Sequence, residues 1–111
     1  VVTGDHLTMD QGYVKSLDKN YTRTVFNLFL NTGLTTTFDK NRQFSNLDMF
    51  PTTLTAIGGK INSQEEQLGL GVNLFSGQKT MIEKYGYSET KKQLEQRSKF
   101  YIKEIIEGKK E

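Results

Sequence analysis

Residues 24–30 constrain the fold class of this chain more than any other segment. They read Thr-Val-Phe-Asn-Leu-Phe-Leu, so Phe26, Leu28 and Leu30 share one face of an extended strand. The opposite face carries Val25 and a second phenylalanine and is therefore largely apolar as well. A strand with two apolar faces is typical of a sheet that helices cover on both sides. We predict a strand over these residues and a fold of the α/β class.

Length and composition set further bounds. The chain has 111 residues, which suits a single domain over residues 1–111. Hydrophobic residues make up 34% and charged residues 25%, and no stretch approaches the roughly 20 apolar residues of a transmembrane helix. We therefore expect no membrane segment in this chain. Cysteine is absent, which excludes a disulfide framework, a thiolate metal site and a cysteine nucleophile.

The charge pattern argues against nucleic-acid binding. The formal net charge is only +2. The densest basic runs, at residues 91–92 and 109–110, alternate with glutamates such as Glu95 and Glu107. A nucleic-acid interface needs basic residues gathered on one face with aromatic side chains among them. We predict no nucleic-acid partner.

A short helix is predicted from about Asp48 to Ile57. The Asp48 carboxylate can accept hydrogen bonds from the free first-turn N–H groups, as an N-cap does. Pro51 falls in the first turn, where its missing N–H costs no helical bond. Gly58 and the glycine after it end the helix.

Two more helices are predicted near the end of the chain. The first covers residues 79–85 and the second runs from Ser88, a good N-cap, to about Glu107. Residues 68–75 form a glycine-interrupted apolar segment that is either extended or a packed loop. Residues 7–22 are polar and are predicted to form a loop, with a helical turn near residues 14–17 as an option.

Asp5 and His6 are the residues with the clearest chemical potential. Residues 1–3 have the pattern of a strand end, and Gly4 follows as a turn, which is where an α/β sheet presents ligands to its active site. A carboxylate beside an imidazole can bind a divalent ion such as Mn²⁺ or Zn²⁺. His6 is the only histidine, and two ligands do not complete a site. A solvated turn remains the alternative.

Three segments resemble a known family. Residues 4–9 (Gly-Asp-His-Leu-Thr-Met) resemble the "GDH" element of lipoteichoic acid synthases and related phosphoglycerol transferases, which belong with sulfatases to the alkaline-phosphatase superfamily. Residues 42–54 are similar to a helix near the end of those catalytic domains, and residues 68–76 to a "GLG…LF" segment. The matches keep the family's order and span residues 3–76.

The resemblance implies a metal site and an incomplete catalytic domain. In that family the Asp and His of the "GDH" element bind a catalytic Mn²⁺-type ion, which carries over to Asp5 and His6. The nucleophile is a threonine far upstream, so no catalytic residue is assigned here. The implied fold is the C-terminal portion of an alkaline-phosphatase-like α/β/α sandwich, with few strands and C-terminal helices. A start at Val1 rather than Met agrees with this expectation of a fragment.

The resemblance also implies an activity for the parent protein. Such an enzyme moves glycerophosphate from a phosphatidylglycerol-type lipid to a polymer or glycan acceptor, at the outer face of the cytoplasmic membrane. Upstream transmembrane helices anchor it there, and the present fragment is expected to be inactive alone. A fragment of a sulfatase or phosphodiesterase of the same superfamily is the nearest alternative. A non-enzymatic binding or structural module is the alternative from another class.

Other polar residues have both a functional and a structural interpretation. Arg42 could touch a substrate phosphate, although a structural salt bridge or plain solvent exposure is the simpler expectation. Asp48 could be catalytic, but helix capping explains it. Tyr13 and Tyr21 could line the mouth of a cleft or simply pack on the surface. Gly69 and its neighbours lack the Lys-Ser/Thr that follows a phosphate-binding glycine loop.

Overall fold

The computed structural model describes residues 1–35, 41–62 and 66–108. It combines helices with two small two-stranded sheets, a mixed α and β composition. The elements in chain order are β1 (Val2–Thr3), α1 (Gln11–Ser16), β2 (Asn27–Leu28), the 3₁₀ turn η1 (Asn46–Asp48), α2 (Met49–Ala56), β3 (Gln67–Leu68), β4 (Gly71–Val72), α3 (Met81–Tyr85), α4 (Tyr87–Leu94), α5 (Lys99–Tyr101) and the π-helical turn η2 (Ile102–Ile106).

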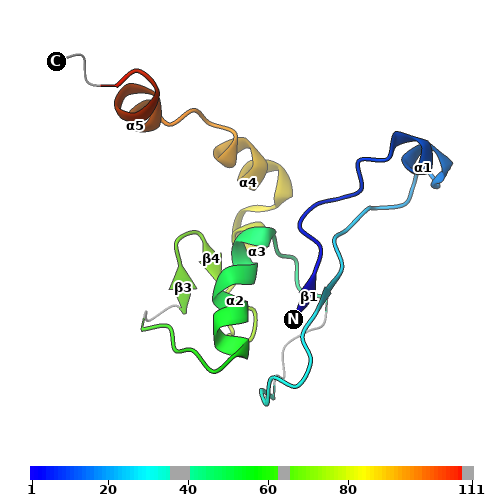
Figure 1. Cartoon of the computed structure of the whole chain (residues 1–111), viewed down its shortest axis with the longest axis vertical. Coiled ribbons are helices and arrows are strands. Elements are labelled where there is room, and N and C mark those ends of the chain that lie inside the picture. The colour runs from blue at the N-terminus through cyan, green and yellow to red at the C-terminus, as the bar shows by residue number, and fades with distance from the viewer. Residues whose placement is uncertain (36–40, 63–65, 109–111) are drawn as a thin grey trace.

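Three parts can be followed in Figure 1. A long hairpin runs from β1 through α1 and back to β2. A central body contains η1, α2, the β3–β4 hairpin and α3, and α2 packs against β4 and β3. The last helices, α4 and α5, lead away from the body toward the C-terminus. Within the described ranges, no helix has both the length and the apolar character needed to cross a membrane.

The first sheet is shorter than the sequence predicts. β1 and β2 are antiparallel, with Val2 opposite Leu28, so the strand expected over residues 24–30 is paired at only two positions. The alternation itself is confirmed, because Val25 is half-buried on one face while Phe26 is 65% exposed on the other. The predicted cover on both faces is wrong for the described part of the chain. Among the described residues, β2 pairs only with the two residues of β1, so the hydrogen-bonded ladder cannot extend further along residues 24–30.

A helix replaces part of the loop predicted for residues 7–22. α1 begins after Asp10, whose carboxylate accepts hydrogen bonds from the backbone N–H groups of Gly12 (2.9 Å) and Tyr13 (3.1 Å). This is an ordinary N-cap, and it stabilises one and a half turns that contain no buried residue. The helical turn suggested near residues 14–17 therefore starts three residues earlier.

The prediction for α2 is confirmed in extent but wrong about its cap. The helix ends where predicted, before Gly58, which has a φ of +89°. Asp48 precedes the helix, but its carboxylate does not accept from the N–H groups of α2. It accepts instead from the backbone N–H groups of Ser45 and Val72, both at 2.9 Å, and is 2% exposed. Asp48 is the last residue of η1, and there a long-range donor, the N–H of Val72, occupies the carboxylate in place of the first N–H groups of α2.

The β3–β4 hairpin settles the alternatives left for residues 68–75. Its two-residue turn contains Gly69, with a φ of +60°. Gly71 in β4 lies against η1, and a Cβ atom there would come within 1.9 Å of the carbonyl oxygen of Leu47. Glycine is therefore required for β4 to approach η1. Thr52 of α2 adds a second link, since its hydroxyl accepts from the backbone N–H of Leu74 at 2.9 Å.

Arg42 joins three segments of the body. Its guanidinium forms a 2.8 Å ion pair with Glu83, and Nε donates to the same carboxylate at 3.1 Å. It also donates to the backbone carbonyls of Leu74 (2.9 Å), Ser76 (3.0 Å) and Gln78. The structural salt bridge expected for Arg42 is thus confirmed. All of its N–H groups are directed to protein acceptors.

Glu83 in turn fixes the start of α3. Its carboxylate accepts from the backbone N–H of Thr80 at 2.9 Å, and the Thr80 hydroxyl accepts from the N–H of Glu83 at 3.1 Å. This reciprocal capping box confirms the short helix predicted over residues 79–85. The Thr80 hydroxyl also donates to the carbonyl of Gln43 at 2.6 Å. The segment around Arg42 is therefore attached to α3 at two adjacent points.

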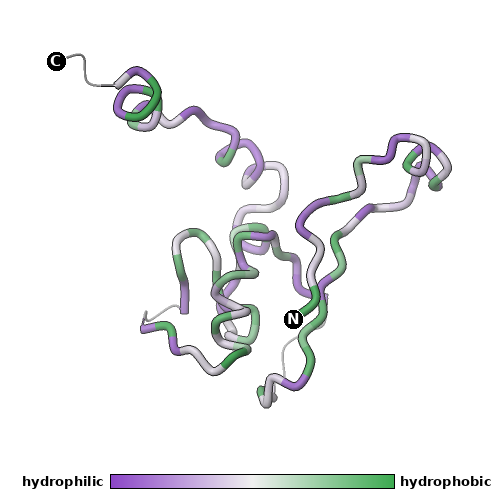
Figure 2. Tube along the Cα trace, viewed as in Figure 1, coloured by the Kyte–Doolittle hydropathy of each residue, from purple (hydrophilic) through white to green (hydrophobic). Residues whose placement is uncertain are grey.

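The long terminal helix predicted from Ser88 to Glu107 is interrupted. α4 begins one residue before Ser88, after Gly86, and ends at Leu94. A new helix begins after Ser98, whose hydroxyl accepts from the N–H of Tyr101 at 3.1 Å. Local capping prevails here because the terminal helix lies away from the body, and its hydrophobic residues (green in Figure 2) have no neighbouring element to bury them.

We expect Arg42→Lys to lower the free energy of unfolding by roughly 2–4 kcal/mol, because a lysine ammonium cannot replace the planar guanidinium at so many acceptors. Urea denaturation of the purified chain measures this. Arg97→Lys, at an exposed position, is the matched control and should be neutral. A loss no larger than that of the control would contradict the central role of Arg42.

The Glu83 carboxylate also gives a pH-dependent prediction. Hydrogen bonding by Arg42 lowers the pKa of Glu83 below its ordinary value of 4.5, outweighing the opposite effect of burial. The resulting stabilisation is fully present above about pH 5 and is lost as the pH falls through the lower, folded-state pKa. Glu83→Gln should therefore be less stable at neutral pH and lose less stability than the wild type between about pH 5 and pH 3. An acid transition as steep as that of Glu89→Gln, an exposed control, would disprove this.

Candidate functional site

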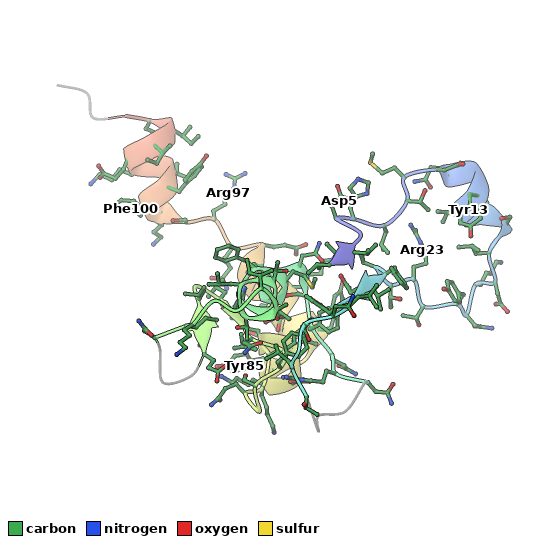
Figure 3. All side chains as sticks on the ribbon, turned by 60° about the horizontal axis from the view of Figure 1, so that its bottom comes forward. Asp5, Tyr13, Arg23, Tyr85, Arg97 and Phe100 are labelled. Atoms are coloured by element: carbon green, nitrogen blue, oxygen red, sulfur yellow. The ribbon has the colours of Figure 1, made fainter. Side chains whose placement is uncertain are left out.

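The Asp5–His6 pair lies directly after β1, at the open end of the first sheet. The backbone N–H of Gly4 donates to the carbonyl of Phe26 at 3.0 Å, so the hairpin is held up to the residue before the pair. The next residues turn away from the sheet, and Figure 3 shows Asp5 beside β1. The site therefore follows a strand, as the sequence predicts.

The two side chains lie next to one another at the surface. His6 Nε2 is 3.6 Å from Asp5 Oδ2, and the side chains are 57% and 89% exposed, respectively. Asp5 Oδ1 accepts a hydrogen bond from the backbone N–H of His6 at 2.9 Å. One carboxylate oxygen is thus used to hold the local backbone, while the other faces the imidazole.

The other imidazole nitrogen is already engaged. Nδ1 of His6 lies 2.8 Å from the carbonyl oxygen of Leu7. A carbonyl can only accept a hydrogen bond, so Nδ1 carries the proton, and Nε2 of the neutral ring has a free lone pair. Histidines that bind metals commonly have this arrangement, with the non-binding nitrogen donating to a carbonyl.

The geometry of the pair fits a cation. The distance between Nε2 and Oδ2 is 3.6 Å, which is too long for a hydrogen bond. In the neutral tautomer both atoms carry lone pairs and repel each other unless a positive charge lies nearby. One carboxylate oxygen and one imidazole nitrogen are a donor set that suits Mn²⁺ or Zn²⁺. Asp5 and His6 therefore fit the ion that the sequence resemblance implies.

Within the residues that the structure describes, Asp5 and His6 have no third partner that would complete a site. No group of three or more His, Asp or Glu side chains is placed to hold a metal ion in those ranges. A divalent ion bound in a protein usually has four or more ligands. The pair can therefore supply only part of a coordination shell.

Two hydrogen bonds support the turn that carries Asp5 and His6, and neither could be predicted from the sequence. The side-chain amide of Asn46 in η1 donates to the backbone carbonyl of Asp5 at 2.6 Å. Arg23 donates to the backbone carbonyl of Thr8 at 2.7 Å. Both partners are distant in sequence, and asparagine and arginine at such positions have no spacing that would predict the contact.

The remaining candidates from the sequence do not join the site. Arg42 is committed to Glu83 and to backbone carbonyls, and Asp48 is buried against Ser45 and Val72. Tyr13 and Tyr21 are 56% and 61% exposed, and Tyr13 projects from α1, away from Asp5 in Figure 3.

A hollow in the described part of the chain lies elsewhere. It has a volume of about 470 Å³ and is formed where Leu30 and Asn31 face Ala56 and Ile57 at the end of α2. Neither Asp5 nor His6 lines it. The site is an exposed pair of ligands on a turn, outside that hollow.

The state of the imidazole can be measured directly. We expect the neutral ring of His6 to carry its proton on Nδ1, because the Leu7 carbonyl holds it there. A long-range ¹H–¹⁵N correlation spectrum in alkaline solution distinguishes the two tautomers. His6 is the only histidine, so its signals need no assignment by mutation. A predominance of the Nε2–H tautomer would contradict this geometry.

Comparisons of the chain with family models, with curated proteins and with solved structures found no match.

Proposed function

We propose that this chain is the C-terminal part of a metal-dependent phosphoglycerol transferase that resembles lipoteichoic acid synthases. Asp5 and His6 would supply two ligands of its divalent ion, of the Mn²⁺ type. The observation that carries the proposal is the arrangement of Nε2 and Oδ2, which face each other at 3.6 Å while Nδ1 is held by a carbonyl. The three family-like segments in the family's order support it.

The residues of this chain would hold and orient the ion. Asp5 contributes one oxygen while its other oxygen keeps the turn closed through the N–H of His6. His6 contributes Nε2, oriented by the bond of Nδ1 to Leu7. A bound divalent ion lowers the pKa of a nucleophilic hydroxyl and neutralises charge on a phosphoryl group. The resemblance places that hydroxyl on a threonine in an upstream part of the parent protein.

The proposed reaction follows from the family resemblance. The threonine oxygen attacks the phosphorus of a phosphatidylglycerol-type lipid, and diacylglycerol leaves with a proton. A hydroxyl of a glycerophosphate polymer or glycan then attacks the same phosphorus and restores the threonine. The parent would act at the outer face of the cytoplasmic membrane, and the isolated chain would have no turnover.

The exposed face of residues 26–30, the segment that contains β2, supports an origin in a larger α/β/α sandwich. Phe26 and Leu30 are 65% and 63% exposed, and Leu28 between them is 38% exposed. A row of three large apolar side chains on one strand face is expected to be covered in a stable protein. In the proposed parent, the rest of the sheet and its helices provide that cover.

The activity can be tested with the full-length parent polypeptide. It is mixed with vesicles that contain phosphatidylglycerol and with Mn²⁺, and the release of diacylglycerol is measured. We expect Asp5→Asn and His6→Gln each to lower the rate about 100-fold or more, since each removes a proposed ligand. Asp18→Asn is the matched control on the same hairpin and should leave the rate unchanged.

Three outcomes would contradict the proposal. Rates for Asp5→Asn and His6→Gln equal to that of the control would exclude the metal role of the pair. Hydrolysis of sulfate esters in place of phosphoglycerol transfer would assign the parent to the sulfatases of the same superfamily. Tight Mn²⁺ binding by the isolated 111-residue chain would also contradict an incomplete site.

A further inference from the structure

We propose that Asn46 is a positioning residue for the Asp5–His6 pair. Its side-chain amide donates to the backbone carbonyl of Asp5 at 2.6 Å, across 41 positions of sequence. This inference rests on the proposed function, because it concerns how the two metal ligands are held. It assigns a role in the site to a part of the body that contains no ligand.

The peptide group between Asp5 and His6 explains why this single bond matters. The carbonyl of Asp5 and the N–H of His6 belong to one planar unit. Asn46 holds the carbonyl end at 2.6 Å, and Asp5 Oδ1 holds the N–H end at 2.9 Å. With both ends bonded, the plane cannot rotate freely. The directions in which the two ligand side chains leave the backbone are therefore fixed relative to each other.

Asn46 can serve as an anchor because its own surroundings are rigid. It is the first residue of η1, and Asp48 in the same turn bonds to Ser45 on one side and to Val72 of β4 on the other. Asp48 is 2% exposed, so this support is protected from water. The bond from Asn46 thus connects an exposed turn to the best-packed part of the chain.

The hairpin by itself leaves the pair with freedom to move. Gly4 before the pair bonds to Phe26, and Thr8 after it bonds to Arg23. Between these points the side chains of Asp5 and His6 are 89% and 57% exposed. Asn46 supplies a third point of attachment between the other two, and it comes from a different part of the fold.

The first test needs no metal. We measure ¹⁵N relaxation of the 111-residue chain and compare the order parameters of residues 5–7 in Asn46→Ala and in the wild type. We expect them to fall from about 0.85 to below about 0.6 in the variant. Asn46→Gln, which keeps the donor on a longer side chain, should recover part of the order. Asn20→Ala removes an exposed amide from the same hairpin and should change nothing.

The same spectra show whether the variant is folded. Residues 48–62 and 66–85 belong to the body, and their amide shifts should be unchanged in Asn46→Ala. Widespread shifts there would mean that the variant unfolds, in which case Asn46→Asp replaces it, because an aspartate has the same shape and its carboxylate cannot donate. Equal order parameters at residues 5–7 in the wild type and in a folded, donor-free variant would overturn the positioning role.

The second test uses Mn²⁺ alone as the probe. Binding near His6 broadens the resonance of its ring Cε1–H, and the Mn²⁺ concentration required should rise about tenfold in Asn46→Ala. Loss of order at residues 5–7 without this rise would overturn the link to metal binding and leave the proposed function standing. Complete broadening of the wild-type His6 resonance by stoichiometric Mn²⁺ would show tight binding and would instead count against the incomplete site of the proposed function.

Discussion

The contact between Arg42 and Glu83 holds the body of this protein together. The Arg42 guanidinium donates hydrogen bonds to the Glu83 carboxylate and to three backbone carbonyls of the segment between β4 and α3. Hydrophobic packing contributes little here, because in the described ranges Met49 and Val72 are the buried hydrophobic side chains. Because the apolar core is so small, directional hydrogen bonds must fix the way in which the elements of the body pack together. Losing one partner of such a network leaves several buried acceptors unsatisfied.

The same logic extends from the body to the Asp5–His6 pair. Asp48 ties η1 to β4, η1 carries Asn46, and Asn46 reaches the carbonyl of Asp5. An aromatic contact runs parallel to this route, with the rings of Phe29 and Phe75 edge to face at 5.4 Å between centroids. The hairpin is therefore attached to the body at a polar and an apolar point. Asp5 and His6 lie in the first third of the chain, but their placement depends on its middle.

Local signals in the sequence predicted the elements that local interactions form. α2 and α3 lie where Pro51 and the glycines after each helix indicate, because a proline in the first turn and a glycine stop act within a few residues. The position of Asp5 and His6 directly after a strand was also predicted, and the structure places their two side chains together. Their role as metal ligands stays a prediction. The family, the activity and the sandwich fold remain proposals based on three short resemblances.

The predictions that failed depended on contacts across the chain. The strand over residues 24–30 needed partners on both sides and has one short partner. The terminal helix needed a surface to bury its apolar face, and without one it breaks at Ser98. Asp48 was predicted to cap α2, but its carboxylate instead accepts a hydrogen bond from the backbone N–H of Val72, 24 positions away. Asn46 was missed for the same reason, since only the folded chain brings it to Asp5.

The most direct measurement is anomalous X-ray scattering at the manganese edge from crystals of the full-length parent grown with Mn²⁺. The account predicts an anomalous peak that both the Asp5 carboxylate and His6 Nε2 contact, with the remaining ligands from upstream residues. A manganese peak bound elsewhere, with these two side chains turned away from it, would contradict the assignment of the pair as metal ligands.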